Sequence, residues 1–230
     1  MSAIALPKPV VDYPDCDGEP MSDNTVQFRW IATLHGNLEA QFRDNPYVFV
    51  AGDHLIYAVE GDNAIRQAPD VYVAFGPAKG DRGSYKVWEE GGIFPQVIFE
   101  VWSPGNRYEK MEKKKDFYEE YGAEEYYILY PSFPAGVAGW IRQDERLVPV
   151  PGMNGFVSPR LGIRFVVDEE DVAVYGPSGR RFLSPAEIEQ EREAAERRLE
   201  IERRQLVSEK LRAEKLATKL RELGVDPERV

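Results

Sequence analysis

The seven residues QVIFEVW, at positions 96–102, decide how this chain folds. Apolar residues fill most of this run, which predicts a strand buried on both faces of a sheet. Glu100 interrupts the run, and carboxylates are rarely buried unless they are paired or bind a metal. Strand alternation places Glu100 on one face with Ile98 and Trp102. The ordinary alternative is a glutamate that faces solvent from a half-exposed strand.

A second carboxylate stands at the start of another apolar run. Pro69 and Asp70 introduce VYVAF at residues 71–75, which is also expected to form a strand. If the two strands pair, Asp70 and Glu100 converge at one edge of the sheet. Two carboxylates, together with water and a phosphate oxygen, suit Mg²⁺. Taken alone, Asp70 would be an ordinary turn residue ahead of a strand.

The segment after the buried strand supplies a basic group. We expect a helix over residues 107–121, ended by Gly122. On a helical wheel Lys114 falls in one arc with Met111 and Tyr118, among apolar positions. An inward ammonium close to two carboxylates can orient water or stabilise charge on a phosphate. The alternative is a lysine whose stem is covered while its ammonium reaches solvent.

The remaining sequence predicts a mixed sheet with helices on its faces. Residues 25–42 have helical periodicity, with Ile31, Leu34 and Leu38 on one stripe. Glycines and prolines in residues 76–94 indicate an exposed connection. Further strands are expected at 47–50, 54–59 and 125–130, and in an antiparallel run at 136–142, 147–150, 161–167 and 172–175. The expected fold class is therefore α/β, a mixed sheet with flanking helices, extra antiparallel strands and a long C-terminal helix.

Composition divides the chain into five parts. We expect a flexible arm over residues 1–20, a globular domain over 21–175, a linker over 176–183, a charged helix over 184–223 and a tail over 224–230. The charged helix has a well-marked start, because Ser184, Pro185 and Glu187 supply an N-cap, a first-turn proline and a capping box.

The C-terminal helix carries an incomplete heptad pattern. One frame places Leu199, Leu206, Ala213 and Leu220 on a seam, with Ala195, Glu202, Glu209, Leu216 and Leu223 at the companion positions. Two glutamates weaken such a seam, so a coiled coil and a solvated single helix both stay open.

Charge and residue usage exclude several classes of protein. The net charge is −11, and only 11 of the 29 basic residues lie in the C-terminal helix and tail, so the globular part is strongly acidic. This acidity counts against tight non-specific nucleic-acid binding. The densest basic cluster of the globular part comprises Arg107, Lys110, Lys113, Lys114 and Lys115.

The same composition limits redox and metal chemistry. One cysteine, Cys16, excludes an internal disulfide framework, and two histidines, His35 and His54, disfavour a histidine-rich metal centre. The first thirty residues contain no apolar signal-peptide core, and the sequence contains no run long enough to span a membrane. We therefore expect a cytoplasmic protein.

Four stretches together resemble a known family. PDVYV (69–73), VIFEVWSP (97–104), EKKKDFY (112–118) and GAEEYY (122–127) are similar to the Uma family of restriction-endonuclease-like proteins, within the PD-(D/E)XK nuclease superfamily. The similarity covers roughly residues 20–175. It implies a metal-dependent phosphodiesterase core, in which Asp70 and Glu100 hold the metal and Lys114 completes the catalytic set. Lys114 matches a lysine that has moved from the strand to the following helix.

The chain also departs from the family pattern. The strand position that usually carries the lysine is Trp102. Relatives often have aspartate where this chain has Gln96, Lys110 and Tyr130, and a helix histidine where it has Gln27. These departures put the strength of metal binding in doubt.

Two functions follow from the residues and the resemblance. The first is a Mg²⁺- or Mn²⁺-dependent endonuclease that hydrolyses DNA, with Asp70, Glu100 and Lys114 as catalytic residues. The alternative is a non-catalytic or weakened nuclease-fold module that associates through its C-terminal helix. Both imply a homo-oligomer without a membrane anchor, and the first implies DNA as the substrate.

Overall fold

The computed structural model describes residues 11–16, 18, 22–132, 134–168 and 170–223. It contains two compact units, with the boundary between Ser184 and Pro185. The first unit carries the sheet and its two covering helices, and the second unit is a helix. The predicted tail at 224–230 lies outside the described residues.

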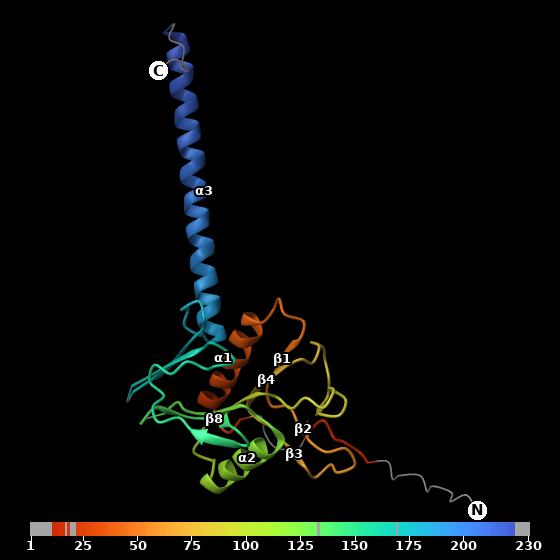
Figure 1. Ribbon diagram of the computed structural model, residues 1–230. Coiled ribbons are helices and arrows are strands. Elements are labelled where there is room, and N and C mark those ends of the chain that lie inside the picture. The colour runs from red at the N-terminus through yellow and green to blue at the C-terminus, as the bar shows by residue number, and fades with distance from the viewer. Residues whose placement is uncertain (1–10, 17, 19–21, 133, 169, 224–230) are drawn as a thin grey trace, which may run out of the picture. The chain divides into compact units, whose positions relative to one another are not determined.

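A six-stranded mixed sheet forms the centre of the first unit (Figure 1). Its spatial order is β1-β4-β6-β7-β8-β9, and the β6–β7 pair is parallel while the other neighbours are antiparallel. Helix α2 connects the two parallel strands, because parallel neighbours need a long crossover connection between them. The bounds are β1 Val48–Ala51, β4 Val71–Phe75, β6 Val97–Val101, α2 Tyr108–Tyr121, β7 Glu125–Tyr130, β8 Gly136–Gln143 and β9 Arg146–Pro149. The predicted fold class is confirmed.

Strand alternation sorts the sheet residues into two cores. Val71 and Val73 join the core that contains the apolar stripe of helix α1 (Thr25–Gln41). Tyr72 and Ala74 join the opposite core, which contains buried residues of α2. The sheet is therefore covered on both faces, which is why its central strands consist of nearly continuous apolar runs.

Helix α1 begins at a capped position. The Asn24 side-chain oxygen accepts hydrogen bonds from the backbone N–H groups of Val26 and Gln27, at 3.0 and 2.9 Å. This satisfies two of the donors that a helix start leaves unpaired. The cap fixes the first turn of α1, where Gln27 is buried.

Two smaller sheets flank the central one. Strands β2 (Ile56–Tyr57), β3 (Arg66–Gln67) and β5 (Tyr85–Lys86) form one, and β10 (Arg164–Val167) and β11 (Val172–Tyr175) form the other. The expected antiparallel run over 136–175 is thus divided between two sheets. The expected exposed connection over 76–94 is wrong at its centre, because β5 pairs in parallel with β2 and buries Tyr85.

The described part of the N-terminal arm contacts the first unit. The Tyr13 ring lies 5.0 Å from the rings of both Tyr57 and Trp88, and Tyr57 donates a hydrogen bond to the carbonyl of Pro14 at 2.6 Å. The flexibility of the arm stays a prediction. Residues 1–10, 17, 19 and 20 lie outside the described part.

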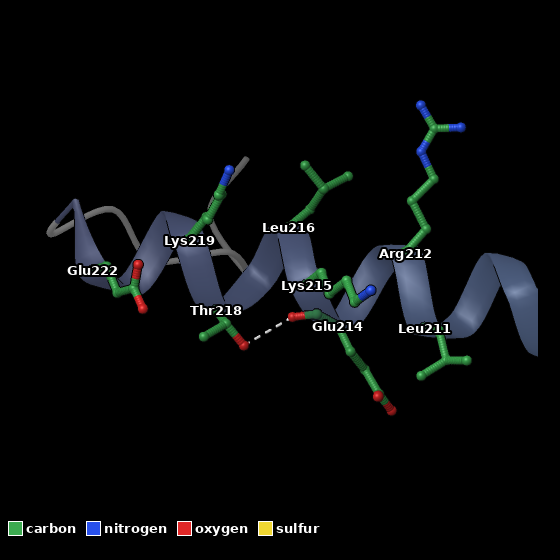
Figure 2. Close-up of a pocket in the computed structure, with 8 residues that line it drawn as sticks. All are labelled: Leu211, Arg212, Glu214, Lys215, Leu216, Thr218, Lys219 and Glu222. Atoms are coloured by element: carbon green, nitrogen blue, oxygen red, sulfur yellow. Dashed lines mark hydrogen bonds between the residues drawn. The ribbon is translucent and has the colours of Figure 1, made fainter.

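The second unit contains helix α3 (Pro185–Glu222), which is 38 residues long and has no buried residue. Its leucines stand among charged side chains, as Figure 2 shows for Leu211 and Leu216. Glutamate and arginine pairs four residues apart support the helix, for example Glu200 with Arg204 at 2.8 Å. In the part of the chain that the structure describes, no helix is long and apolar enough to cross a membrane.

Candidate active site

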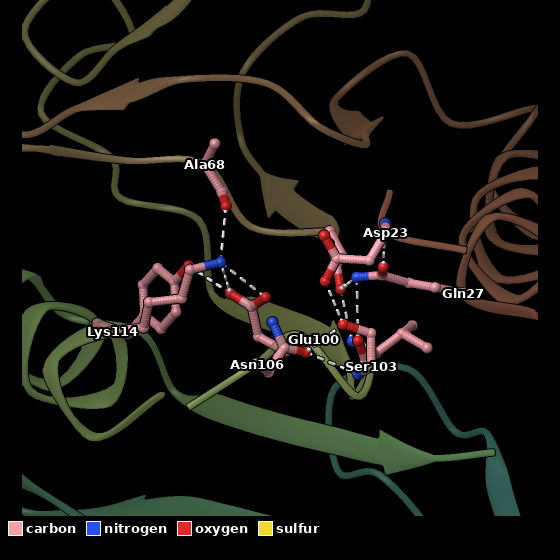
Figure 3. Close-up of polar contacts among 10 residues, drawn as sticks. Asp23, Gln27, Ala68, Glu100, Ser103, Asn106 and Lys114 are labelled. Atoms are coloured by element: carbon pink, nitrogen blue, oxygen red, sulfur yellow. Dashed lines mark hydrogen bonds and ion pairs between the residues drawn. The ribbon is translucent and has the colours of Figure 1, made fainter. Parts of the chain in front are cut away.

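The candidate residues come from three elements that the sheet brings together. Strands β4 and β6 pair, which is the condition for the two carboxylates to converge, and Val71 lies opposite Phe99. This antiparallel register places Asp70, just before β4, beside Glu100 in β6. Lys114 reaches the same place from α2, and Figure 3 shows it approaching Glu100 from the side opposite to Gln27. Residues separated by 44 positions in the sequence thus share one site.

Glu100 is enclosed, with 1% of its surface exposed. The alternative of a solvent-facing glutamate is therefore wrong, because α2 and the second core cover this face of β6. Its Oε1 accepts hydrogen bonds from Lys114 Nζ at 2.9 Å and from the Tyr118 hydroxyl at 2.8 Å. Its Oε2 accepts from Lys114 Nζ at 2.8 Å. The buried carboxylate is both neutralised and hydrogen-bonded, which is the condition for keeping a charge in an apolar interior.

Lys114 faces inward, as its position on the helical wheel predicts. Besides the two oxygens of Glu100, its ammonium donates to the carbonyl of Ala68 at 3.0 Å. Only 12% of the side chain is exposed, so the lysine does not reach out to bulk solvent. The ion pair ties α2 to β6, and the hydrogen bond to Ala68 ties it to the segment that leads into β4.

Asp70 is half-buried, and the charges of Glu100 and Lys114 both act on it. Burial, together with the neighbouring charge of Glu100, raises the pKa of Asp70 to about 7. Lys114, the Val101 N–H and the Gln27 amide act in the opposite direction. Asp70 Oδ2 accepts a hydrogen bond from Val101 N at 2.6 Å. This contact fixes the carboxyl group at the end of β6.

Several polar residues of the site were not predicted from the sequence. Gln27 donates to the carbonyl of Val101 at 3.2 Å, and the backbone N–H of Asp23 donates to the Gln27 side-chain oxygen at 2.8 Å. Fully buried Ser103 donates to a carboxylate oxygen of Asp23 (Figure 3). A signal did exist for two of them: Tyr118 follows Lys114 by one helical turn, and Gln27 precedes Ile31 on the apolar stripe by one turn.

The oxygen atoms of the site suit a hard divalent cation. The carboxylates of Asp70 and Glu100 and the carbonyl of Val101 are donors of the kind that Mg²⁺ and Mn²⁺ prefer. A cation bound beside Asp70 would oppose the two effects that raise its pKa, which are burial and the charge of Glu100. Among the described residues, no group of three or more His, Cys, Asp or Glu side chains could hold a metal ion. A cation here would depend on two carboxylates, a main-chain oxygen and water.

Comparisons with known proteins identify the family of this chain. The sequence matches the Uma2 family, described as "Putative restriction endonuclease", over residues 6–203. A solved structure from Anabaena variabilis, described as "a putative nuclease belonging to DUF820", is 12% identical, with a TM-score of 0.44 over 59% of this chain and 72% of that chain. No curated protein matches the sequence. The family match spans most of the chain and confirms the resemblance inferred from the sequence. This chain belongs to the Uma2 family, whose description is "Putative restriction endonuclease".

Proposed function

We propose that this protein is an endonuclease that hydrolyses phosphodiester bonds in DNA and depends on Mg²⁺ or Mn²⁺. The family description supports nuclease activity in general. The observation that carries the finer proposal is the contact of the Lys114 ammonium with both oxygens of Glu100, beside Asp70. Two carboxylates with an adjacent lysine suit phosphodiester hydrolysis. In that reaction, negative charge on the phosphate oxygens must be stabilised while one P–O bond forms and another breaks.

Each residue has a distinct task in this proposal. Asp70, Glu100 and the Val101 carbonyl would hold the cation, which when bound supplies Lewis-acid polarisation of a phosphate oxygen and a lower pKa for its water. Glu100 also orients Lys114, whose charge lies in a largely desolvated position where it acts strongly on a phosphate. Tyr118 holds Glu100 from the core side.

The substrate surface follows from the positions of the exposed basic residues. Arg107, Lys110 and Lys113 are exposed at the start and along the outer side of α2, the helix that carries Lys114. They can contact backbone phosphates on either side of the bond that is cut. Because the rest of the globular part is acidic, we expect weak binding that decreases steeply with salt.

Cleavage of supercoiled plasmid with Mg²⁺ or Mn²⁺ tests the proposal. Glu100→Gln, Asp70→Asn and Lys114→Ala should each lower the rate by about 100-fold or more, because each removes a charge at the reacting phosphate. Lys215→Ala is the control, since it removes an exposed lysine from α3, a helix to which no substrate contact is assigned. Equal rates for the wild type and the three site variants would remove the assignment.

One observation favours a second candidate, a weakened module that retains the fold. Both oxygens of Glu100 already accept hydrogen bonds, and among the described residues no third carboxylate completes a metal-binding group with Asp70 and Glu100. Such a module would give no heat on calorimetric titration with Mn²⁺. Its main property would be association through α3, which removal of residues 185–230 would abolish.

A further inference from the structure

The side-chain amide of Gln27 lies between two oxygen atoms of the candidate site. Gln27 is 5% exposed and extends from the first turn of α1. Its Nε2 donates to the Val101 carbonyl at 3.2 Å and, more weakly, to Asp70 Oδ2 at 3.5 Å. A single NH₂ group therefore bridges a main-chain oxygen and a carboxylate oxygen from neighbouring strands.

The direction of the amide is determined by its surroundings. The backbone N–H of Asp23 donates to Gln27 Oε1 at 2.8 Å, so the oxygen end of the amide faces a donor. Val101 O and Asp70 Oδ2 are both acceptors, and the nitrogen end faces them. A reversed amide would place oxygen against oxygen and N–H against N–H, and each buried group left unpaired in this way is unfavourable.

We propose that the Gln27 NH₂ group occupies the position from which a divalent cation would contact Asp70 and Val101. The inference rests on the proposed function, because it assumes that these oxygens hold the cation. The amide supplies two partly positive hydrogens to the same two oxygens, so the cation and the amide compete for them. Gln27 thus competes with the cation and weakens the affinity of the site for metal. When no metal is bound, the same amide keeps Asp70 ordered.

Two substitutions at this position separate competition from other roles. Gln27→Met keeps the length of the side chain and removes both hydrogens, so Mn²⁺ should bind about 3-fold or more tightly, the equivalent of one net hydrogen bond. Gln27→Glu replaces the competitor by a third carboxylate and should tighten Mn²⁺ binding by about 10-fold or more. Gln41→Glu is the control, because it makes the same change on the same helix, at a residue whose Nε2 donates instead to the carbonyl of Leu161.

Isothermal titration of the full chain with Mn²⁺, followed by thermal unfolding with and without Mn²⁺, gives the test. Tighter binding in both Gln27 variants, with Gln41→Glu at the wild-type affinity, supports the proposal. Gln27→Glu should also unfold at a lower temperature than wild type without Mn²⁺ and recover when Mn²⁺ is added, because three carboxylates then repel one another only in the metal-free protein.

Unchanged affinity in both Gln27 variants, or weaker binding by Gln27→Met, would overturn the inference while leaving a metal-binding wild type consistent with the proposed nuclease. Absence of Mn²⁺ binding in wild type and all variants would overturn both. Tighter Mn²⁺ binding by both Gln27 variants, together with no plasmid cleavage by the wild type, would overturn the nuclease proposal and leave the inference on Gln27 in place.

Discussion

Removing one partner of the ion pair between Glu100 and Lys114 destabilises the fold more than removing both partners. Removing the lysine leaves a buried carboxylate with Tyr118 as its remaining hydrogen-bond donor among the described contacts. Removing both charges leaves no such uncompensated group, and pairs of this kind are often replaceable by uncharged residues. The pair therefore contributes little net stability as a unit, although each partner depends strongly on the other.

Lys114→Met should lower the free energy of unfolding by about 3–5 kcal/mol, because it leaves the buried charge of Glu100 without its ion-pair partner. Urea denaturation at neutral pH measures this change. Lys113→Met, at an exposed neighbour on the same helix, should stay within about 0.5 kcal/mol of wild type. The double variant Glu100→Gln with Lys114→Met should recover part of the loss. A Lys114→Met protein as stable as the Lys113→Met control would show that the ammonium is not buried against Glu100.

Asp70 should make the metal-free protein less stable as pH rises. Its pKa is about 7 in the fold against an ordinary 3.8, so the folded chain holds the proton more tightly than the unfolded chain does. The favourable contribution is complete below pH 4 and is lost as pH rises towards 7. Asp70→Asn removes this loss. At pH 8, with a chelator present, the substitution should raise the free energy of unfolding by roughly 1–3 kcal/mol, a range that allows for partial solvent screening. Parallel stability–pH curves for the variant and wild type would contradict the shifted pKa.

At the residue scale, the sequence indicated the charged members of the site better than the neutral ones. Glu100 and Lys114 were visible because each is a charge at an apolar position. Gln27 and Ser103 are buried as well, yet Ser103 in its loop gives no such signal, and Gln27 gives only its place one turn before Ile31 on the apolar stripe. Their partners are main-chain groups and distant side chains, which depend on the tertiary fold rather than on local spacing.

At the element scale, the segments with strong apolar runs or stripes could be predicted closely. Strands β4 and β7 have the predicted bounds, and α1 and α2 differ by one residue at an end. Strand β5 could not be found in the same way, since it has two residues and lies in a glycine-rich segment. It is a strand because it pairs with β2, almost thirty residues earlier in the sequence. The residues next to β5 do not predict that long-range pairing.

The end of α2 offers a test of local backbone conformation. Gly122 has φ of +105° and caps the helix, and a Cβ added there would meet no atom within 4 Å. Gly122→Ala should therefore cost about 1–2 kcal/mol through the backbone alone. Gly136 is equally open but has no positive φ, so Gly136→Ala should be neutral or slightly stabilising. Chemical denaturation compares the two, and equal losses would show that the left-handed conformation is not the cause.

At the scale of the whole molecule, the two units have different kinds of surface. The first unit buries two apolar cores and contains the candidate site, whereas α3 leaves its leucines exposed, Leu199 at 66% and Leu216 at 55%. Both belong to the heptad frame found in the sequence. Exposed leucines at that spacing favour pairing with a second helix, although Glu202 and Glu209 oppose a close parallel seam.

A chain ending at Ser184 should fold and bind Mn²⁺ like the full chain, because the described site residues all belong to the first unit. We expect the full chain to form an oligomer and the shortened chain to be a monomer, since the exposed leucines of α3 are removed. Light scattering after size exclusion gives the two masses. A monomeric full chain would remove the association proposal, and loss of folding in the shortened chain would contradict the independence of the two units.

If Asp70 and Glu100 hold a divalent cation for phosphodiester hydrolysis, anomalous diffraction from Mn²⁺-soaked crystals should locate it. We expect a single strong manganese peak in contact with a carboxylate oxygen of Asp70 and within reach of Glu100 and the Val101 carbonyl. The same soak of Asp70→Asn crystals should show no peak at that position. Manganese bound elsewhere in wild-type crystals, with none beside Asp70, would show that these carboxylates do not form the metal site.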